Sequence, residues 1–229
     1  MQEPKDFYND WVDYLSEKKT RHEQVFKGLQ RCNLGAGKTV LDLGCGTGIT
    51  SIFMARNGCK VTGVDFAEKL IEYAEKHNSN KNTEYLVGDI TEIDLGKPFD
   101  LICMTDVIEH IDPERIGKLM ETVQKHAHYL TVVYVNVPYH LFTEYGRDKF
   151  QQQPIETAIP MALLFQLFEA AGWAPMDVFM YGLGSPVEYV EICFVTKRNL
   201  TIMWDHYYNQ QPASEESEAS GEAQEKENN

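Results

Sequence analysis

Short apolar runs alternate with amphipathic stretches along most of the chain, and this alternation predicts βαβ units around a mostly parallel sheet. Strands are expected at about residues 39–43, 60–64, 84–87, 99–104, 129–135, 176–181 and 189–197. Helices are expected at about residues 49–56, 67–77, 113–126 and 161–171. The pattern therefore predicts an α/β protein with helices on both faces of its sheet.

Four of the predicted strands end in small or acidic residues. The first runs into a glycine cluster, and the next three are followed by Asp65, by Gly88 and Asp89, and by Thr105 and Asp106. In open parallel sheets, ligands bind beyond the carboxyl ends of the strands, near the point where the strand order reverses. We therefore expect these residues to surround a ligand.

The predicted elements indicate one domain between two flanking segments. Residues 1–36 carry an aromatic stripe near helical spacing, which predicts a helical lid on residues 37–200, the domain itself. A polar and aromatic insertion at about residues 136–156 is too long for an ordinary connection and is expected to cover the ligand site. Residues 201–229 include an acidic tail that is expected to be disordered.

Composition narrows the classes of partner and the compartment. The formal net charge of -14 disfavours nucleic acid and anionic membranes, because proteins that bind them neutralise phosphate with Lys and Arg. Five scattered cysteines without a CxxC pair indicate a reducing compartment. No signal peptide, membrane-spanning stretch or set of metal ligands is predicted, so we expect a soluble, cytoplasmic protein.

The strongest chemical signal is the motif VLDLGCGTG at residues 40–48, which places Gly44, Gly46 and Gly48 after a predicted buried strand. A dinucleotide fingerprint needs a small residue where this chain has Ile49, so that alternative fails. Asp42, two residues before the first glycine, suits a ligand with a cationic ammonium and sulfonium and would repel a pyrophosphate. The motif therefore favours S-adenosylmethionine over a dinucleotide.

The segment from residue 40 to about residue 110 resembles the cofactor half of class I S-adenosylmethionine-dependent methyltransferases, in the UbiG-like and methyltransferase type 11 or 12 groups. The likeness is specific in the glycine motif and in DVIEHI at residues 106–111. It implies a Rossmann-like sheet of seven strands, mostly parallel, whose last strand, at residues 189–197, is antiparallel. It also implies methyltransferase activity.

The resemblance implies a set of cofactor-binding residues: Asp42, Gly44, Gly46, Gly48, Asp65, Phe66, Asp89, Ile90, Thr105 and Asp106. The three glycines line the methionine and the ribose, and Asp42 helps hold the amino group. Thr105 and Asp106 lie beside the methionine moiety.

The remaining implied roles concern the ribose and the adenine. Asp65 accepts hydrogen bonds from both ribose hydroxyls, which suits a carboxylate. Phe66 packs on the adenine face, Asp89 accepts from the exocyclic amine, and the Ile90 amide meets a ring nitrogen. Each has a structural alternative: Asp65 as a helix cap, Asp89 as a turn residue and Phe66 as part of the core.

Methyl transfer from a sulfonium mainly needs alignment of the acceptor, but an oxygen acceptor also needs a base. His110 and His140 are the candidates, since both follow predicted strands at the cofactor edge of the sheet. The alternative for His110 is packing beside the cofactor without proton transfer. Possible acceptor contacts are Glu109, Tyr139, Glu144, Tyr145 and Arg147.

The sequence therefore predicts transfer of a methyl group to a hydroxyl or amine of a small molecule, with a sugar or glycan precursor ahead of a quinone-type phenol. A non-catalytic regulatory protein that binds the cofactor is the alternative from another class. A protein or nucleic-acid methyltransferase is disfavoured, for nucleic acid by the acidic charge.

Overall fold

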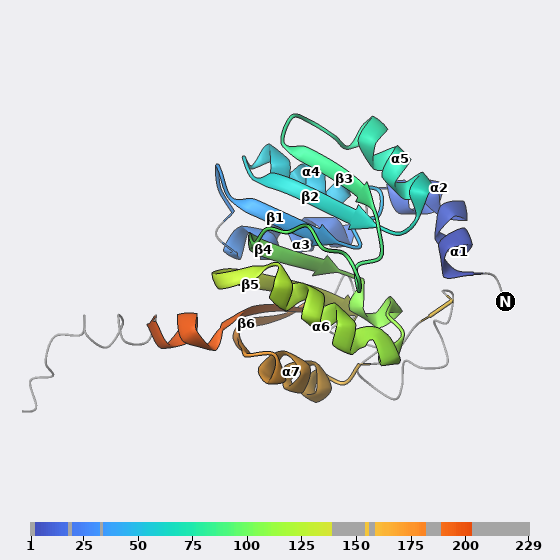
Figure 1. Cartoon of the computed structure of the whole chain (residues 1–229). Helices are drawn as coiled ribbons and strands as arrows, with labels where there is room; N and C mark the ends of the chain where they lie inside the picture. The colour runs from blue at the N-terminus through green and yellow to red at the C-terminus, as the bar shows by residue number, and fades with distance from the viewer. Residues whose placement is uncertain are drawn as a thin grey trace, which may run out of the picture.

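The sheet has seven strands in the order β3-β2-β1-β4-β5-β7-β6 in the computed structural model, which describes residues 3–17, 20–32, 34–138, 154–155, 159–181 and 189–202 (Figure 1). The strands are β1 (Thr39–Leu43), β2 (Lys60–Asp65), β3 (Thr83–Val87), β4 (Phe99–Thr105), β5 (Ala127–Pro138), β6 (Trp173–Tyr181) and β7 (Tyr189–Thr196). The first five are parallel, and β7 is antiparallel to both β5 and β6. This arrangement confirms the predicted Rossmann-like sheet with an antiparallel last strand.

The order of the strands reverses at β1, whose neighbours are β2 on one side and β4 on the other. Leu43, the last residue of β1, is in register with Val64 of β2 and Met104 of β4. The carboxyl ends of these three strands therefore meet at one edge of the sheet, where an open α/β sheet binds its ligands.

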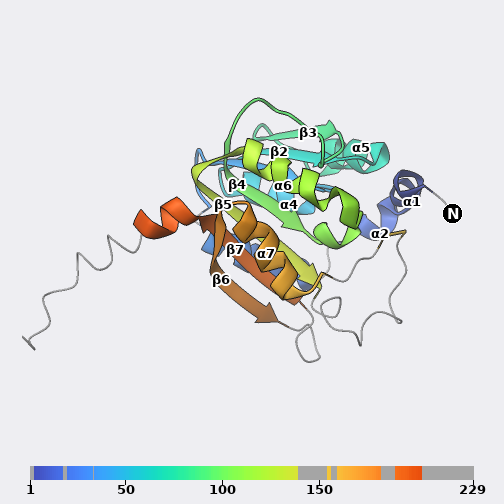
Figure 2. The ribbon, with the colours of Figure 1, turned by 60° about the horizontal axis from the view of Figure 1, so that its bottom comes forward.

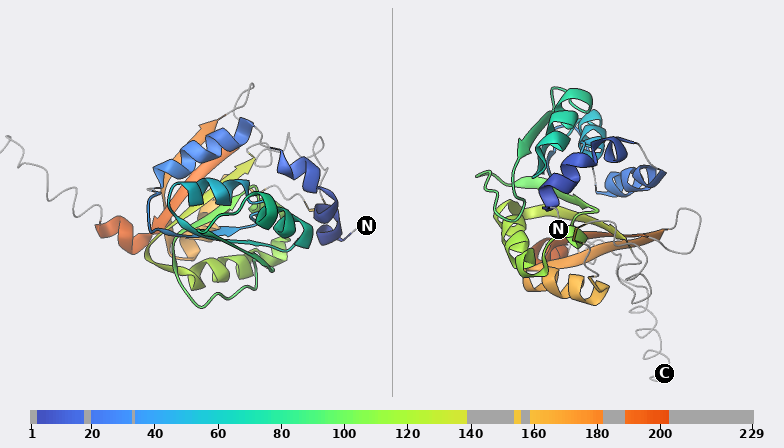
Figure 3. Two further views of the ribbon diagram at one scale, coloured as in Figure 1. Left: turned by 90° about the horizontal axis from the view of Figure 1, so that it is seen from above. Right: turned by 90° about the vertical axis from the view of Figure 1, so that its right-hand side faces the viewer.

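Helices cover both faces of the sheet. They are α1 (Pro4–Asp10), α2 (Val12–Ser16), α3 (Thr20–Arg31), α4 (Ile49–Arg56), α5 (Glu68–His77), α6 (Ile116–Lys125) and α7 (Met161–Ala170), with short 3-10 helices η1 (Ile108–His110) and η2 (Pro113–Arg115). Side chains of α6 and α7 pack on one face, which is turned forward in Figure 2, and side chains of α3 and α4 pack on the other. The short helices α1 and α2 lie beyond the edge to which the parallel strands point (Figure 1 and Figure 3).

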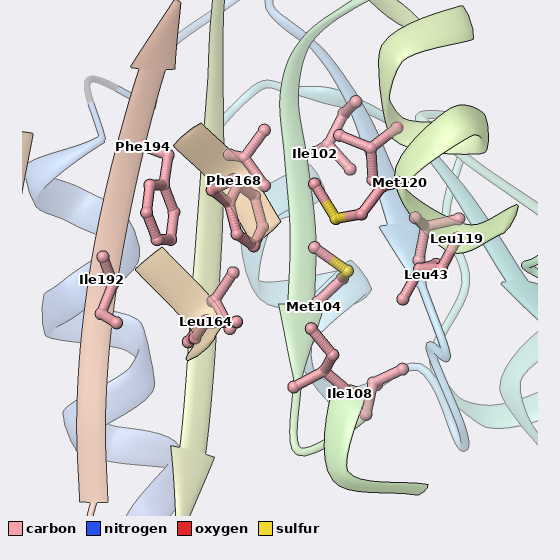
Figure 4. Close-up of a cluster of buried hydrophobic side chains, with 14 of the residues drawn as sticks. Leu43, Ile102, Met104, Ile108, Leu119, Met120, Leu164, Phe168, Ile192 and Phe194 are labelled. Carbon is pink, nitrogen blue, oxygen red and sulfur yellow. The ribbon is translucent and has the colours of Figure 1, made fainter. Parts of the chain in front are cut away.

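The larger core lies between the sheet and the pair α6 and α7 (Figure 4). In α6 the apolar residues Ile116, Leu119, Met120 and Val123 recur at helical spacing and are all buried. Phe168 of α7 stacks on a phenylalanine of β7 with ring centroids 3.9 Å apart. Full burial of each such side chain stabilises the fold by roughly 1.5–3 kcal/mol, which holds the sheet rigid beneath its ligand edge.

Most predicted bounds are confirmed within one or two residues, and three differ. The helix predicted at 113–126 starts as η2, because Asp112 accepts from the Glu114 amide at 3.0 Å in a tight first turn, and becomes α-helical at Ile116. Strand β6 begins at Trp173, before the predicted start at about residue 176. Strand β5 is longer at both ends than predicted: it begins at Ala127, which pairs with Phe99 of β4, and β7 pairs with it as far as Pro138. Residues 136–138 therefore belong to the sheet and not to an insertion.

The rest of the predicted insertion falls mainly outside the described residues, and so does the predicted acidic tail. Within the described ranges, no helix combines the length and the apolar character needed to cross a bilayer.

Candidate active site

A cavity of about 590 Å³ opens at the carboxyl ends of the parallel strands, against α1 and α2. Nine of the ten predicted cofactor residues line it: Asp42, Gly44, Gly46, Asp65, Phe66, Asp89, Ile90, Thr105 and Asp106. His110, one of the two predicted bases, lines it as well. The structure therefore brings together residues that are spread over about seventy positions of the sequence.

The loop after β1 requires glycine at two positions, where the backbone is left-handed and neighbouring side chains leave no room for a Cβ. Gly44 has a φ of 71°, and a Cβ there would lie 2.5 Å from a methyl carbon of Val107. Gly48 has a φ of 77°, and a Cβ there would lie 2.5 Å from the hydroxyl oxygen of Tyr85. Gly48 is not among the described residues that line the cavity, so it serves packing on Tyr85, and its contact with a cofactor stays a prediction.

Asp65 ends β2 and fastens the glycine loop to the start of α5. Its Oδ2 accepts from the Gly46 amide at 2.9 Å and its Oδ1 from the Ala67 amide at 3.0 Å. Burial raises the pKa of Asp65 to about 6, although the amides of Ala67 and Gly46 oppose the shift. The capping alternative is thus part of its role, and because a carboxylate has about four acceptor positions, Asp65 retains capacity for a ligand hydroxyl beside the amides of Ala67, Gly46 and Phe66.

Asp42 lies under the glycine loop and is only 1% exposed. The hydroxyl of Ser51 donates to its Oδ2 at 2.5 Å. Burial raises the pKa of Asp42 to about 7, against the hydrogen bonds from Ser51 and Cys103, and the charge of Asp65 adds to the rise. Two neighbouring buried carboxylates therefore make this part of the cavity favourable for a cation.

The loop after β3 carries the residues predicted for the adenine. Oδ1 of Asp89 accepts from the amide of Thr91 at 2.9 Å and from its hydroxyl at 2.8 Å, and Oδ2 accepts from Arg115 at 2.6 Å. The turn alternative for Asp89 is therefore correct as a description of its local geometry. Phe66 is 36% exposed and lines the cavity, so it is not a core residue. Ile90 also lines the cavity but is largely buried.

The end of β4 places a strained residue at the cavity. Asp106 has a φ of 53°, which an L residue with a side chain rarely adopts, and its amide donates to the Asn136 carbonyl at 2.9 Å. Strained backbone of this kind collects at functional sites, where the surrounding structure holds it. Thr105 precedes it and lines the same wall.

His110 lies in η1 with its ring nearly buried. Its Nδ1 is 2.8 Å from the carbonyl oxygen of Ile155, and because a carbonyl only accepts, Nδ1 carries the proton of that hydrogen bond. In the neutral ring Nε2 is then an acceptor, and it lies 3.8 Å from Oε1 of Glu109. The pair can take up a proton at Nε2 and stabilise the resulting positive charge.

The other predicted residues of the acceptor side cannot be placed. Tyr139, His140, Glu144, Tyr145 and Arg147 lie outside the described residues, and Glu109 alone of that set lines the cavity.

The N-terminal helices close one side of the cavity. Tyr8, Trp11, Tyr14 and Leu15 line it, as the aromatic stripe predicts. The carbonyl of Leu15 accepts from the hydroxyl of Thr47 at 3.0 Å, which joins α2 to the glycine loop. The helix α1 is joined to α5 through an ion pair between Lys5 and Glu68.

The residues that line the cavity without having been predicted from the sequence include His22, Thr47 and Arg115. Thr47 lies between Gly46 and Gly48 in the glycine motif, and this position could have indicated that it lines the cavity. Arg115 follows the DVIEHI segment by four residues, but its contact with the loop after β3 has no local signature.

Part of the chain is similar to known proteins. Residues 40–128 match the family described as Methyltransferase domain. A relative from Schizosaccharomyces pombe, named ubiquinone biosynthesis O-methyltransferase, mitochondrial, is 38% identical over 112 residues, which cover 46% of this chain and 41% of that protein. The protein named ubiquinone biosynthesis O-methyltransferase in Pseudomonas fluorescens is 36% identical over 115 residues, which cover 46% of this chain and 49% of that protein. Residues 40–128 of the chain thus form a methyltransferase domain.

Solved structures of low sequence identity share the fold of the methyltransferase domain. Magnesium protoporphyrin IX methyltransferase from Synechocystis PCC 6803 with bound S-adenosylmethionine has a TM-score of 0.63 at 16% identity, and the match covers 86% of this chain and 99% of that one. The DhpI complex with S-adenosylhomocysteine has a TM-score of 0.64 at 18% identity, with 85% and 96% covered. The methyltransferase domain thus has the expected Rossmann-like fold.

The chain matches about half the length or less of these two curated relatives, and the family match covers residues 40–128 alone. What the relatives act on therefore bears on this chain only as a proposal. The cytoplasmic location stays a prediction too, since one relative is named as mitochondrial.

Proposed function

We propose that this chain transfers the methyl group of S-adenosylmethionine to a hydroxyl of a small aromatic acceptor. Two buried carboxylates beside the glycine loop carry the cofactor part of the proposal, because burial raises the pKa of Asp42 to about 7 and that of Asp65 to about 6. A cationic ligand stabilises the ionised form of both groups, so its binding offsets part of the cost of their burial.

The charge of the cavity fits S-adenosylmethionine. Seven carboxylate residues and two Lys or Arg residues stand among the described residues that line it. Both cations have partners, since Lys5 pairs with Glu68 and Arg115 with Asp89. The surplus of carboxylates favours a ligand with an ammonium and a sulfonium.

When bound, S-adenosylmethionine supplies a methyl group on a sulfonium, which is already activated for displacement. The chain's part is to hold and orient the cofactor and the acceptor and to exclude water. Asp65 and Asp42 hold the sugar and amino ends, and Tyr8, Trp11 and Tyr14 keep water from the acceptor side.

His110 is the proposed base for a hydroxyl acceptor. Nδ1 donates to the Ile155 carbonyl, so in the neutral ring the hydroxyl proton would go to Nε2, and Glu109 would stabilise the charged ring. Since Glu109 is nearly buried, this stabilisation is little screened by solvent.

Aromatic side chains favour a phenol as the acceptor. Tyr8, Trp11, Tyr14 and Tyr189 line the cavity, and Tyr8 lies edge-on to His110 with ring centroids 6.1 Å apart. Such rings offer flat apolar surface for an aromatic acceptor. The names of the curated relatives also favour the quinone-type phenol over the sugar or glycan precursor that the sequence analysis put first.

Calorimetry with S-adenosylmethionine tests the cofactor assignment. We expect binding to the wild type and at least a tenfold loss in Asp65→Ala, since hydrogen bonds to a charged group are worth about 1.5–3 kcal/mol. Asp94→Asn, at an exposed position of a loop, is the matched control and should bind normally. A folded wild type without affinity for the ligand would refute the methyltransferase function.

Turnover with methyl-labelled cofactor tests the acceptor. We expect label on catechol and none on glucose. Label on glucose alone would refute the phenol and support the sugar class, and binding without transfer to a metabolite extract would support the non-catalytic alternative.

A further inference from the structure

Arg115 joins η2 to the loop after β3, and both segments border the cavity. It ends η2, and its guanidinium donates to Oδ2 of Asp89 at 2.6 Å and also contacts the hydroxyl of Thr91. A third contact, to Oε1 of Glu92, is longer, at 3.4 Å. Arg115 and Asp89 both line the cavity, so the guanidinium holds the carboxylate at the surface that a ligand meets.

The hydrogen bonds of Asp89 leave one of its acceptor positions open. Oδ1 accepts hydrogen bonds from the amide and the hydroxyl of Thr91, and Oδ2 accepts one from the guanidinium of Arg115. A carboxylate offers about four acceptor positions, so the open one lies on Oδ2. The side chain of Asp89 is 42% exposed, which leaves this position accessible to a donor in the cavity.

The surroundings also keep Asp89 ionised. Burial raises the pKa of Asp89, the hydrogen bonds from Arg115 and Thr91 lower it, and the net pKa lies below the ordinary value. A carboxylate fixed in this way before the ligand arrives accepts a hydrogen bond without the entropy cost of ordering a free side chain.

We propose that Arg115 is a positioning residue for the subsite that binds the adenine of the cofactor. It orients Asp89 so that the cavity selects a purine with an exocyclic amine over one with an oxo group. The amine donates to the open position on Oδ2, whereas a carbonyl oxygen would face the carboxylate with its own lone pairs. This inference rests on the proposed function, because it concerns the adenine of the same cofactor.

Arg115 also ties the start of α6 to the loop after β3, so its loss is expected to lower stability whatever its role in binding. A purely structural residue would affect all ligands of the cavity alike. The ratio of two affinities for ligands that differ at one group therefore separates the two roles.

The test is calorimetry of the full chain with S-adenosylhomocysteine and S-inosylhomocysteine, well below the melting temperature of each variant. In the wild type we expect the adenosyl compound to bind about 100-fold more tightly, the upper range for a hydrogen bond to a charged acceptor. In Arg115→Met this ratio should fall to about 10, with the inosyl affinity nearly unchanged. Arg115→Lys should restore part of the ratio, because a cation again reaches Asp89 without the planar fork.

Lys118→Met is the matched control, because Lys118 is a cation in the first turn of α6 that lies 3.4 Å from Glu92 and, among the described residues, forms no hydrogen bond or ion pair with Asp89. It should keep the wild-type ratio. An equal loss for both ligands in Arg115→Met, or an unchanged ratio, would overturn the positioning role while leaving the cofactor assignment intact. Failure of the wild type to bind either ligand would overturn both.

Discussion

Asp42→Asn tests whether the buried charge of Asp42 lowers the stability of the fold while it raises the affinity for the cofactor. Asp42 is 1% exposed, and burial raises its pKa from 3.8 to about 7. Asparagine is nearly isosteric and keeps an oxygen for the hydroxyl of Ser51, which lies 2.5 Å from the carboxylate. The substitution therefore removes the charge with little change of shape.

The size of the effect follows from the pKa shift. A rise from 3.8 to about 7 corresponds to roughly 4 kcal/mol of cost to the folded state when Asp42 is ionised. Because the folded pKa lies above the unfolded one, the folded state binds more protons between about pH 4 and pH 7, and this group's contribution to stability is lost as the pH rises through that window. The new amide group finds a weak acceptor in the thiol of Cys103 and costs about 1–2 kcal/mol.

The expected result is a variant about 2 kcal/mol more stable than the wild type at pH 8, with no gain at pH 4. Urea unfolding at a series of pH values measures it, and calorimetry should show at least a tenfold weaker affinity for S-adenosylmethionine at pH 8. A gain of equal size at every pH, or a loss at pH 8, would refute the electrostatic reasoning. Unchanged affinity would refute the contact of Asp42 with the cofactor.

Three further substitutions test separate parts of the structure. Gly44→Ala should abolish detectable cofactor binding and destabilise the fold by about 1–3 kcal/mol, because the new Cβ meets Val107 at 2.5 Å in a left-handed position; calorimetry and thermal melting check both, and normal binding would contradict the loop geometry. His110→Gln should lower kcat about 100-fold with the affinity for S-adenosylmethionine within twofold, as steady-state kinetics would show; an unchanged kcat would leave His110 a packing residue. Arg31→Met removes the cation that lies 2.6 Å from the buried carboxylate of Glu191 and should cost about 2 kcal/mol at pH 8 in urea unfolding. It should cost less at pH 5, because burial raises the pKa of Glu191 and protonation then relieves the unpaired charge, whereas a cost independent of pH would contradict that explanation.

The cofactor half could be predicted from the sequence because its signals are local. The helix predicted at residues 49–56 is observed as Ile49–Arg56, since a glycine motif precedes it and Asn57 and Gly58 end it. Asp65 could be placed at the ligand edge from its position after a single apolar strand. In such cases a few consecutive residues determine both the element and the group at its end.

Contacts between distant segments carry no such signal. Arg115 and Asp89 are separated by 26 positions, and nothing in either segment indicates that they pair. The length of β5 likewise depends on its pairing with β7, so the end of the strand at Pro138 could not be inferred from its own residues. These features follow from the fold and not from local periodicity.

The same distinction explains why the acceptor is harder to infer than the cofactor. The matched family segment covers residues 40–128, whereas the aromatic residues Tyr8, Trp11 and Tyr189 lie outside it on elements far apart in the chain. The family match over that segment therefore constrains the methyl donor much more than the acceptor. It follows that substitutions of Tyr8 or Trp11 should change the KM for the acceptor more than the affinity for the cofactor. Substitutions of Asp42 or Asp65 should change the affinity for the cofactor more than the KM for the acceptor.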